Sequence, residues 1–260
     1  MLDTLYIQTT QEILKISDPA WVSSTFLTFF CIAVIVLIGY YLPEEHRNTF
    51  TKFLGVLFFV RLIFLHGYQT GMGHWLISNS LPLHLCGISS IVCIIIMFKY
   101  NQSLFEYIVL LGIPSAIHSI LTPQFINGWE GYYFPEFYFS HGAILLVPLY
   151  LTINYVHKLR KDAWKTAFLK TLLAAFIVGI INKVIDFLYI TMHRPKPLEE
   201  PEKWEILQTN YMYTYVSPEA NNPLLFTKDW PYYFLLLVFL MFIHVLVVFY
   251  IYKLIGRVEE

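Results

Sequence analysis

The sequence contains few charged residues. Only 13% of its 260 residues are Asp, Glu, Lys or Arg, whereas 57% are apolar and the mean hydropathy is +0.57. So few charges cannot cover the outside of a globule in water, which excludes a soluble domain. The composition predicts an integral membrane protein that forms a single transmembrane domain over residues 1–260.

Long basic runs and paired cysteines are also missing. The net charge is −1, and no cluster of Lys or Arg suggests a nucleic-acid partner. The cysteines are Cys31, Cys86 and Cys93, an odd number with no C-x-x-C pair, so neither a disulfide framework nor a structural zinc site is expected. The stretch before the first apolar run is acidic rather than basic, so we expect no removable signal peptide.

Long apolar runs dominate what is present. A hydrocarbon core of about 30 Å needs about 20 apolar residues per helical span. Open strands would leave backbone groups unpaired in lipid, so the spans should be helices. The sequence therefore predicts an all-α bundle of seven transmembrane helices. The predicted spans are 21–43, 49–71, 81–99, 103–121, 136–157, 164–191 and 230–254.

The basic residues of the short loops predict the orientation. They lie after the first, third and fifth spans and in the C-terminal tail, whereas the loops after spans two and four have none. Because positive charge stays inside, we expect the N-terminus outside and the C-terminus inside. The Lys-, Ile-, Asn- and Tyr-rich composition favours a bacterial plasma membrane. The basic residues are Arg47, Lys52, Lys99, Lys158, Arg160, Lys161, Lys165, Lys253 and Arg257.

Polar residues gather in the outer third of five consecutive spans. Polar groups are costly in hydrocarbon unless they are paired or wet. We therefore expect a shared polar cavity that opens toward the outer face. The residues are, in chain order, His66, Gln69, His84, Cys86, Ser115, His118, Ser119, Ser140, His141, Asn182, Lys183 and Asp186.

A loop of about 35 residues, 193–229, separates the last two spans, and loops of this length are usually functional or disordered. Its second half is rich in Tyr and Trp, which favour the headgroup level. The segment could be an interfacial belt or a lid over a site, and the sequence leaves both open. Tyr211 is its candidate contribution to the site.

Cys86 is the candidate nucleophile, with a histidine from another span as its base. A paired imidazole stabilises the reactive thiolate, and His141 lies at matching depth on the fifth span. His84 lies about 200° from Cys86 on an ideal helix. Both can serve one site only if the helix begins irregularly or the cavity wraps around it.

Each of these residues also has a purely structural interpretation. A lone buried cysteine usually packs as a small hydrophobe, and Cys31 and Cys93 are interpreted in that way. A histidine inside a span usually forms a hydrogen bond between helices, and His244 is interpreted so. Asp186 could simply neutralise Lys183. Several histidines at one depth nevertheless favour a functional site.

Four segments resemble the transmembrane protein 164 / YwaF family. They are "LPLHLCGIS", "FYFSHGAIL", "NYMY" and "WPYYFLLL", and the resemblance extends over residues 50–250. It implies a seven-helix intramembrane enzyme with a Cys and His pair, whose animal members are linked to acyl transfer onto lysophospholipids. Cys86 matches the nucleophile of the family and His141 its histidine. The architecture is also similar to that of the androgen-induced-gene-1-like intramembrane lipid hydrolases, which use Thr and His.

These patterns predict an acyltransferase that acts on membrane phospholipid at the outer leaflet. Cys86 would carry the acyl chain as a thioester, and His141 would move the protons. Ser115, His118 or Asn182 could stabilise the oxyanion. No metal or other cofactor is expected. The supporting residues are His84, His66, Ser115, His118, Asn182, Asp186 and Tyr211.

Two alternatives stay open. A zinc hydrolase could use His66, His84, His118, His141 and Asp186 as ligands, although no H-E-x-x-H helix supports it. A transporter or binding protein could use the polar cavity for a solute or a proton, although no repeated halves are visible. Acyl transfer and hydrolysis of the thioester are not separable from the sequence.

Overall fold

The computed structural model describes residues 12–13, 18–125, 131–193, 209–218 and 224–259. Most of these residues are helical. A ladder two residues long pairs β1 (Glu12–Ile13) with β2 (Gln124–Phe125) in antiparallel register. The segments 194–208 and 219–223 of the predicted long loop lie outside the described residues.

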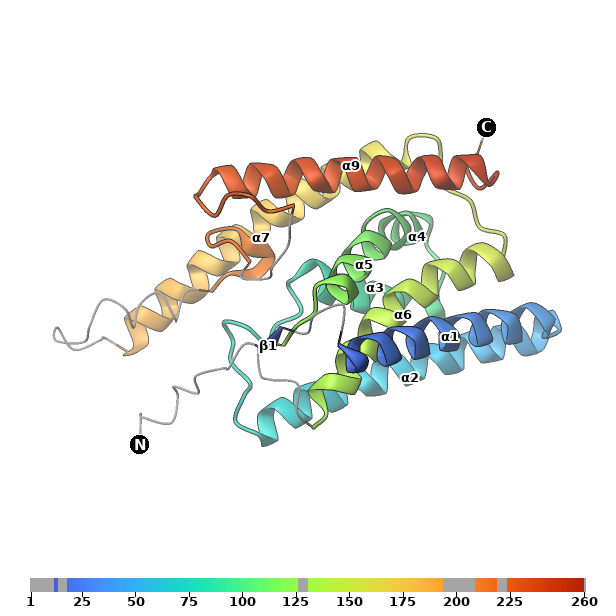
Figure 1. Cartoon of the computed structure of the whole chain (residues 1–260), viewed down its shortest axis with the longest axis horizontal. Helices are drawn as coiled ribbons and strands as arrows, with labels where there is room; N and C mark the ends of the chain where they lie inside the picture. The colour runs from blue at the N-terminus through green and yellow to red at the C-terminus, as the bar shows by residue number, and fades with distance from the viewer. Residues whose placement is uncertain (1–11, 14–17, 126–130, 194–208, 219–223, 260) are drawn as a thin grey trace.

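Six helices in the described part of the chain are long and apolar enough to cross a membrane. This confirms an all-helical membrane architecture. Helices α1, α2 and α6 form one side of the molecule, α7 and α9 form the other, and α3, α4 and α5 lie between them (Figure 1). The six are α1 (Pro19–Tyr41), α2 (Glu44–Gly71), the continuous helix Gln102–Leu121, α6 (Tyr133–Asn154), α7 (Ala163–His193) and α9 (Tyr232–Leu254).

The predicted third span differs from the structure. Helix α3 (Leu85–Phe98) has 14 residues, fewer than the roughly 20 needed to cross the hydrocarbon. Residues 81–84 form a turn instead of the first helical turn. The turn folds back onto the helix, since a Cβ atom at Gly87 would lie 2.8 Å from the Cα atom of Pro82. Gly87 is therefore required for this close approach.

The predicted fourth span is a helix with an irregular centre. It consists of α4 (Gln102–Tyr107), the π-helical turn η2 (Ile108–Gly112) and α5 (Ile113–Leu121). Pro114, the second residue after the π turn, has no N–H for a regular helical hydrogen bond, so the ladder must be irregular at this point. All residues of η2 are buried at the centre of the bundle.

The turn between α1 and α2 is held by one arginine. Arg47 donates from Nε to the Gly39 carbonyl at 2.8 Å and from Nη1 to the Asn154 carbonyl at 2.8 Å. The last carbonyls of a helix have no partner within the helix, so Arg47 satisfies such groups of α1 and α6 together. It thereby ties three helices at one end of the bundle.

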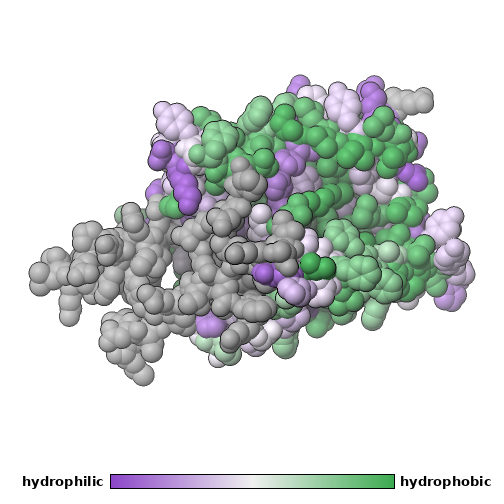
Figure 2. Space-filling view, viewed as in Figure 1, coloured by the Kyte–Doolittle hydropathy of each residue, from purple (hydrophilic) through white to green (hydrophobic). Residues whose placement is uncertain are grey.

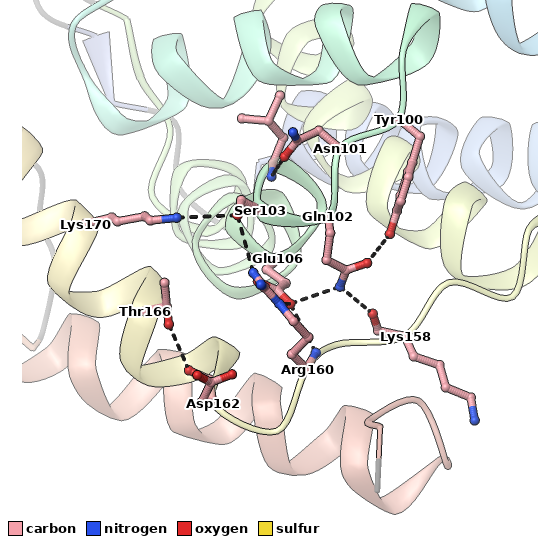
Figure 3. Close-up of polar contacts among 11 residues, drawn as sticks. Tyr100, Asn101, Gln102, Ser103, Glu106, Lys158, Arg160, Asp162, Thr166 and Lys170 are labelled. Carbon is pink, nitrogen blue, oxygen red and sulfur yellow. Dashed lines mark hydrogen bonds and ion pairs between the residues drawn. The ribbon is translucent and has the colours of Figure 1, made fainter.

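A second polar cluster lies at the same end (Figure 3). The buried carboxylate of Glu106 accepts hydrogen bonds from Arg160 Nε at 2.8 Å and Nη2 at 2.6 Å, and from Gln102 Nε2 at 2.9 Å. A buried carboxylate needs such partners because its charge has left water. The pair joins the α6–α7 connection to α4, and Glu106 raises the pKa of the Arg160 guanidinium.

The helices present apolar side chains to the outside. Hydrophobic residues cover most of the visible helical surface (Figure 2). Phe26 on α1 is 71% exposed and Phe176 on α7 is 69% exposed. Exposed apolar surface on this scale is unfavourable in water and suits contact with lipid.

Successive helices run in opposite directions, so their ends gather at two ends of the bundle. The last turns of α2 and α5 meet the first turns of α3 and α6 at one end, which we call the site end. The basic residues Arg47, Arg160 and Arg257 lie at the opposite end. Cys86 and most of the predicted polar residues belong to the site end.

Candidate functional site at the start of helix α3

Cys86 is the second residue of α3. The first three N–H groups of a helix have no acceptor within it, and the helix dipole favours negative charge at this point. In α3 these are the amides of Leu85, Cys86 and Gly87. The position therefore suits a thiolate, and it places backbone donors next to the sulfur atom.

The side chain of His141 interacts with the Cys86 thiol. It belongs to the third turn of α6, and its Nδ1 lies 2.7 Å from the carbonyl oxygen of Phe137. A carbonyl can only accept, so Nδ1 carries the hydrogen atom in the neutral ring. Nε2 is then the basic nitrogen, and the main chain of α6 holds the imidazole in the tautomer that a base requires.

Two serines of α5 complete the surroundings of the thiol. Ser119 Oγ lies 3.5 Å from Cys86 Sγ, and Ser115 is a further side-chain hydrogen-bond partner of the thiol. Ser115 also donates to the Gly112 carbonyl at 2.9 Å, next to the irregular turn η2. The structure thus brings Cys86, His141 and Ser115 together, along with Ser119, which the sequence placed at the same depth.

An ion pair beside this group was not part of the sequence prediction. Arg61 Nη1 lies 2.5 Å from Glu136 Oε1, and Arg61 Nη2 donates to Ser90 Oγ at 2.8 Å. Arg61 belongs to α2, and its long side chain reaches the first turn of α6. Glu136 acts electrostatically on His141. The available signal was an arginine within one apolar span and a glutamate at the start of another, because a charge inside the membrane needs a partner.

His84 lies just outside α3, with extended backbone (φ −69°, ψ 156°) rather than helical angles. The helix start is therefore irregular, which is one of the two conditions under which His84 and Cys86 could share a site. The ring of His84 packs against Tyr211 at 5.3 Å and Tyr213 at 5.2 Å between ring centroids. Burial raises the pKa of Tyr213 to about 12, so its hydroxyl stays protonated.

Tyr211 and Tyr213 belong to η3 (Tyr211–Tyr213), in the second half of the predicted long loop. The buried Asn182 of α7 holds this segment: its Nδ2 donates to the Tyr211 carbonyl at 2.9 Å and to Thr214 Oγ1 at 2.8 Å. Tyr211 is fully buried, and its hydroxyl donates to the Ile77 carbonyl at 2.7 Å. Residues 209–217 therefore pack against α7 and the approach to α3 rather than lying apart as a surface belt.

Asp186 has a related structural role. Its Oδ1 accepts a hydrogen bond from the Thr209 backbone at 2.8 Å. Lys183, which the sequence paired with Asp186, lies 3.8 Å over the ring of Tyr215. Asn182 and Asp186 thus hold the loop segment onto α7, and the thiol has other partners.

His66 and His118 have partners outside the Cys86 group. His66 Nδ1 accepts from Trp75 Nε1 at 3.1 Å, and His118 Nε2 lies 2.8 Å from His244 Nε2. The pair with His244 joins α5 to α9. His244 makes a second hydrogen bond, to the Leu240 carbonyl. His244 therefore makes two hydrogen bonds, whereas one was expected from the sequence.

The predicted zinc ligands do not form a common donor set. Within the part of the chain that the structure describes, no three His, Cys, Asp or Glu side chains gather as a metal site. A catalytic zinc ion requires three protein ligands. His66, His118 and Asp186 are instead engaged by Trp75, His244 and Thr209.

The apolar helices and their lipid-facing surface define a multi-pass membrane protein, with a Cys–His–Ser group at one end of the bundle. A model of the TMEM164 family matches residues 15–250, so the chain belongs to this family. No curated protein and no solved structure matches it.

Proposed function

We propose that the protein is an intramembrane acyltransferase that carries the acyl chain on Cys86. The observation that supports this best is the pairing of a thiol at a helix N-terminus with an imidazole whose Nδ1 is bound to a carbonyl. Such a pair is suited to nucleophilic attack on an ester, because the base is already in the correct tautomer. The family resemblance implies the same chemistry.

The first half-reaction forms the thioester. His141 Nε2 takes the proton of the Cys86 thiol, and the thiolate attacks the ester carbonyl carbon of a membrane phospholipid. The bond between that carbon and the alcohol oxygen then breaks. The departing lysophospholipid oxygen takes the proton from His141. The acyl chain is left on the sulfur atom.

The second half-reaction regenerates the free enzyme. The hydroxyl group of a lysolipid acceptor gives its proton to His141, and its oxygen attacks the thioester carbonyl. The carbon–sulfur bond breaks, the acceptor is acylated, and the thiol of Cys86 regains the proton. Water in place of the acceptor would release a fatty acid, so exclusion of water determines how much transfer occurs.

The negative oxygen of each tetrahedral intermediate needs hydrogen-bond donors. Of the three donors that the sequence suggested, Ser115 touches Cys86, whereas His118 and Asn182 are engaged by His244 and Tyr211. The backbone amides of Cys86 and Gly87 at the start of α3 are further donors. Donors of this kind contribute about 10²–10³-fold in rate.

The proposal includes a topology. Helix α3 and the turn before it together form the seventh crossing, and the N-terminus lies outside. Arg47, Arg160 and Arg257 lie at the end opposite Cys86, which is the inner end if positive charge stays inside. The site then faces the outer leaflet, in a bacterial plasma membrane.

The decisive experiment follows an acyl chain through Cys86. Purified protein in lipid nanodiscs is mixed with a phospholipid that carries a labelled acyl chain, and the intact mass of the protein is measured. We expect one added acyl group that hydroxylamine removes and that a lysophospholipid acceptor discharges. Cys86→Ala abolishes the adduct, and Cys31→Ser, which changes an exposed cysteine of α1, is the matched control.

Two results would contradict the proposal. Transfer that persists in Cys86→Ala would exclude the thiol as the acyl carrier. An unmodified protein that moves a solute or protons across the membrane of proteoliposomes, in both the wild type and Cys86→Ser, would favour the transporter alternative. Discharge to water alone would instead define a lipid hydrolase with the same nucleophile.

A further inference from the structure

The main chain determines the tautomer of His84. The backbone N–H of Met212 donates a hydrogen bond to His84 Nδ1 at 3.3 Å. A backbone N–H can only donate, so Nδ1 must present its lone pair. In the neutral imidazole the hydrogen atom is then on Nε2. His84 is therefore an N–H donor at Nε2 and has no basic nitrogen left.

This donor arrangement is built into the fold. Met212 and Tyr213 have φ values of 57° and 53°, in the left-handed region that bulky residues rarely adopt. Such a conformation persists only where the surroundings impose it. Here Asn182 holds Tyr211 through both its N–H and its carbonyl, and the Tyr233 hydroxyl donates to the Tyr213 carbonyl at 3.0 Å.

His84 precedes the nucleophile by two residues in the chain. It lies directly before α3. Its backbone is extended, so the separation of about 200° from Cys86 that an ideal helix would impose does not apply. Its ring lies between Tyr211 and Tyr213, which limits its rotation. Tyr213 also interacts electrostatically with the Cys86 thiol, which links this aromatic group to the site.

The two histidines are complementary. His141 has its hydrogen atom on Nδ1, bound to a carbonyl, and offers a basic Nε2. His84 has its Nδ1 bound to an N–H and offers a donor at Nε2. Attack on an ester requires both a base for the nucleophile and a donor for the carbonyl oxygen.

We propose that His84 is a further catalytic residue, whose Nε2–H donates a hydrogen bond to the acyl carbonyl oxygen as Cys86 attacks. This inference rests on the proposed function. It assigns opposite roles to two imidazoles at one site: His141 moves protons, and His84 stabilises the oxyanion without exchanging its proton. The stabilisation exists only where a tetrahedral intermediate forms.

Two reactions of the same thiol separate these roles. Alkylation of Cys86 by iodoacetamide is a displacement at a saturated carbon and forms no oxyanion, whereas acylation by a p-nitrophenyl acyl ester does. His84→Phe keeps an aromatic ring between the two tyrosines but has no donor, and His84→Gln restores an N–H donor. His74→Ala, which removes a histidine bound to Tyr133, is the control.

We expect His84→Phe to keep the alkylation rate within about twofold and to lower acylation by about 10²–10³-fold. His84→Gln should recover part of the loss, and His141→Ala should lower both rates. Equal acylation by the wild type and His84→Phe overturns the inference, and so does a parallel loss of both reactions in both His84 variants. A wild-type protein that is alkylated but never acylated overturns the proposed function itself.

Discussion

Arg61 and Glu136 form an ion pair, 2.5 Å between Nη1 and Oε1, that joins the middle of α2 to the first turn of α6. The side chain of Arg61 is 9% exposed and that of Glu136 is 12% exposed. Ser90 Oγ of α3 accepts a hydrogen bond from the second guanidinium nitrogen, Nη2. The pair thus connects three helices beside Cys86 and His141. Its geometry accounts for an arginine in the middle of an apolar span, where an unpaired charge would be costly.

Removing one partner of this pair should be strongly destabilising. Arg61→Met leaves Glu136 buried without a counter-charge, and we expect a loss of about 3–5 kcal/mol. The thermal midpoint of unfolding in detergent should fall accordingly. The double variant Arg61→Met with Glu136→Leu should regain most of it. Lys52→Met, at an exposed position of α2, should change stability by less than about 0.5 kcal/mol. An unchanged midpoint in Arg61→Met would contradict this account.

Gly87→Ala should damage the site. The new Cβ atom would lie 2.8 Å from the Cα atom and 2.9 Å from the carbonyl carbon of Pro82, so the backbone before α3 must move. A displacement of about 1 Å can lower a rate about 10²-fold, and we expect a loss of this order in Cys86 acylation. Gly67→Ala is the matched control, since a Cβ atom there meets nothing within 4 Å. Full acylation by Gly87→Ala would disprove the required close approach.

Asn182→Leu should release the segment 209–217 from α7. The substitution leaves the Tyr211 N–H and carbonyl without their partner, at about 1–3 kcal/mol for each buried unsatisfied group. We expect faster hydrogen exchange at residues 209–217 and faster limited proteolysis there. Val184→Ala, at an exposed position of the same helix, should leave both rates unchanged. Equal exchange in the Asn182 variant and the wild type would refute this role.

His157 should make stability depend on pH. It stacks on Tyr100 at 3.8 Å between ring centroids, and burial lowers its pKa. The unfolded state, with a His pKa of about 6.5, then binds the proton more readily than the folded state. The contribution of this group is therefore fully present above about pH 6.5 and is lost as the pH falls below that value toward the lower pKa of the folded state. The thermal midpoint of His157→Phe should fall less between pH 7 and pH 5 than that of the wild type; identical profiles would count against it.

The helical spans could be predicted from the sequence because apolar runs of membrane length leave few alternatives in lipid. The third span was the exception. A window of apolar residues contains no sign that Pro82 folds back over Gly87, so the prediction began the helix at residue 81 and the structure begins it at Leu85.

The site could be predicted only in part. Its depth follows from residue position along each span, and this placed Cys86, His141 and Ser115 at one end. Partners depend on how each helix is rotated about its axis and on which helices are neighbours. For this reason the sequence grouped His118 with Cys86, whereas the structure pairs it with His244. The long reach of Arg61 to Glu136 was missed for the same reason.

The sequence by itself determined that the protein is a bundle of membrane helices with Cys86, His84 and His141 at one end, because hydrophobicity and chain direction set the depth of every residue. The tertiary structure decided which of these groups meet and which nitrogen of each imidazole carries hydrogen. That choice depends on contacts between helices and with single backbone groups, such as the Phe137 carbonyl and the Met212 N–H, which no local pattern of residues encodes.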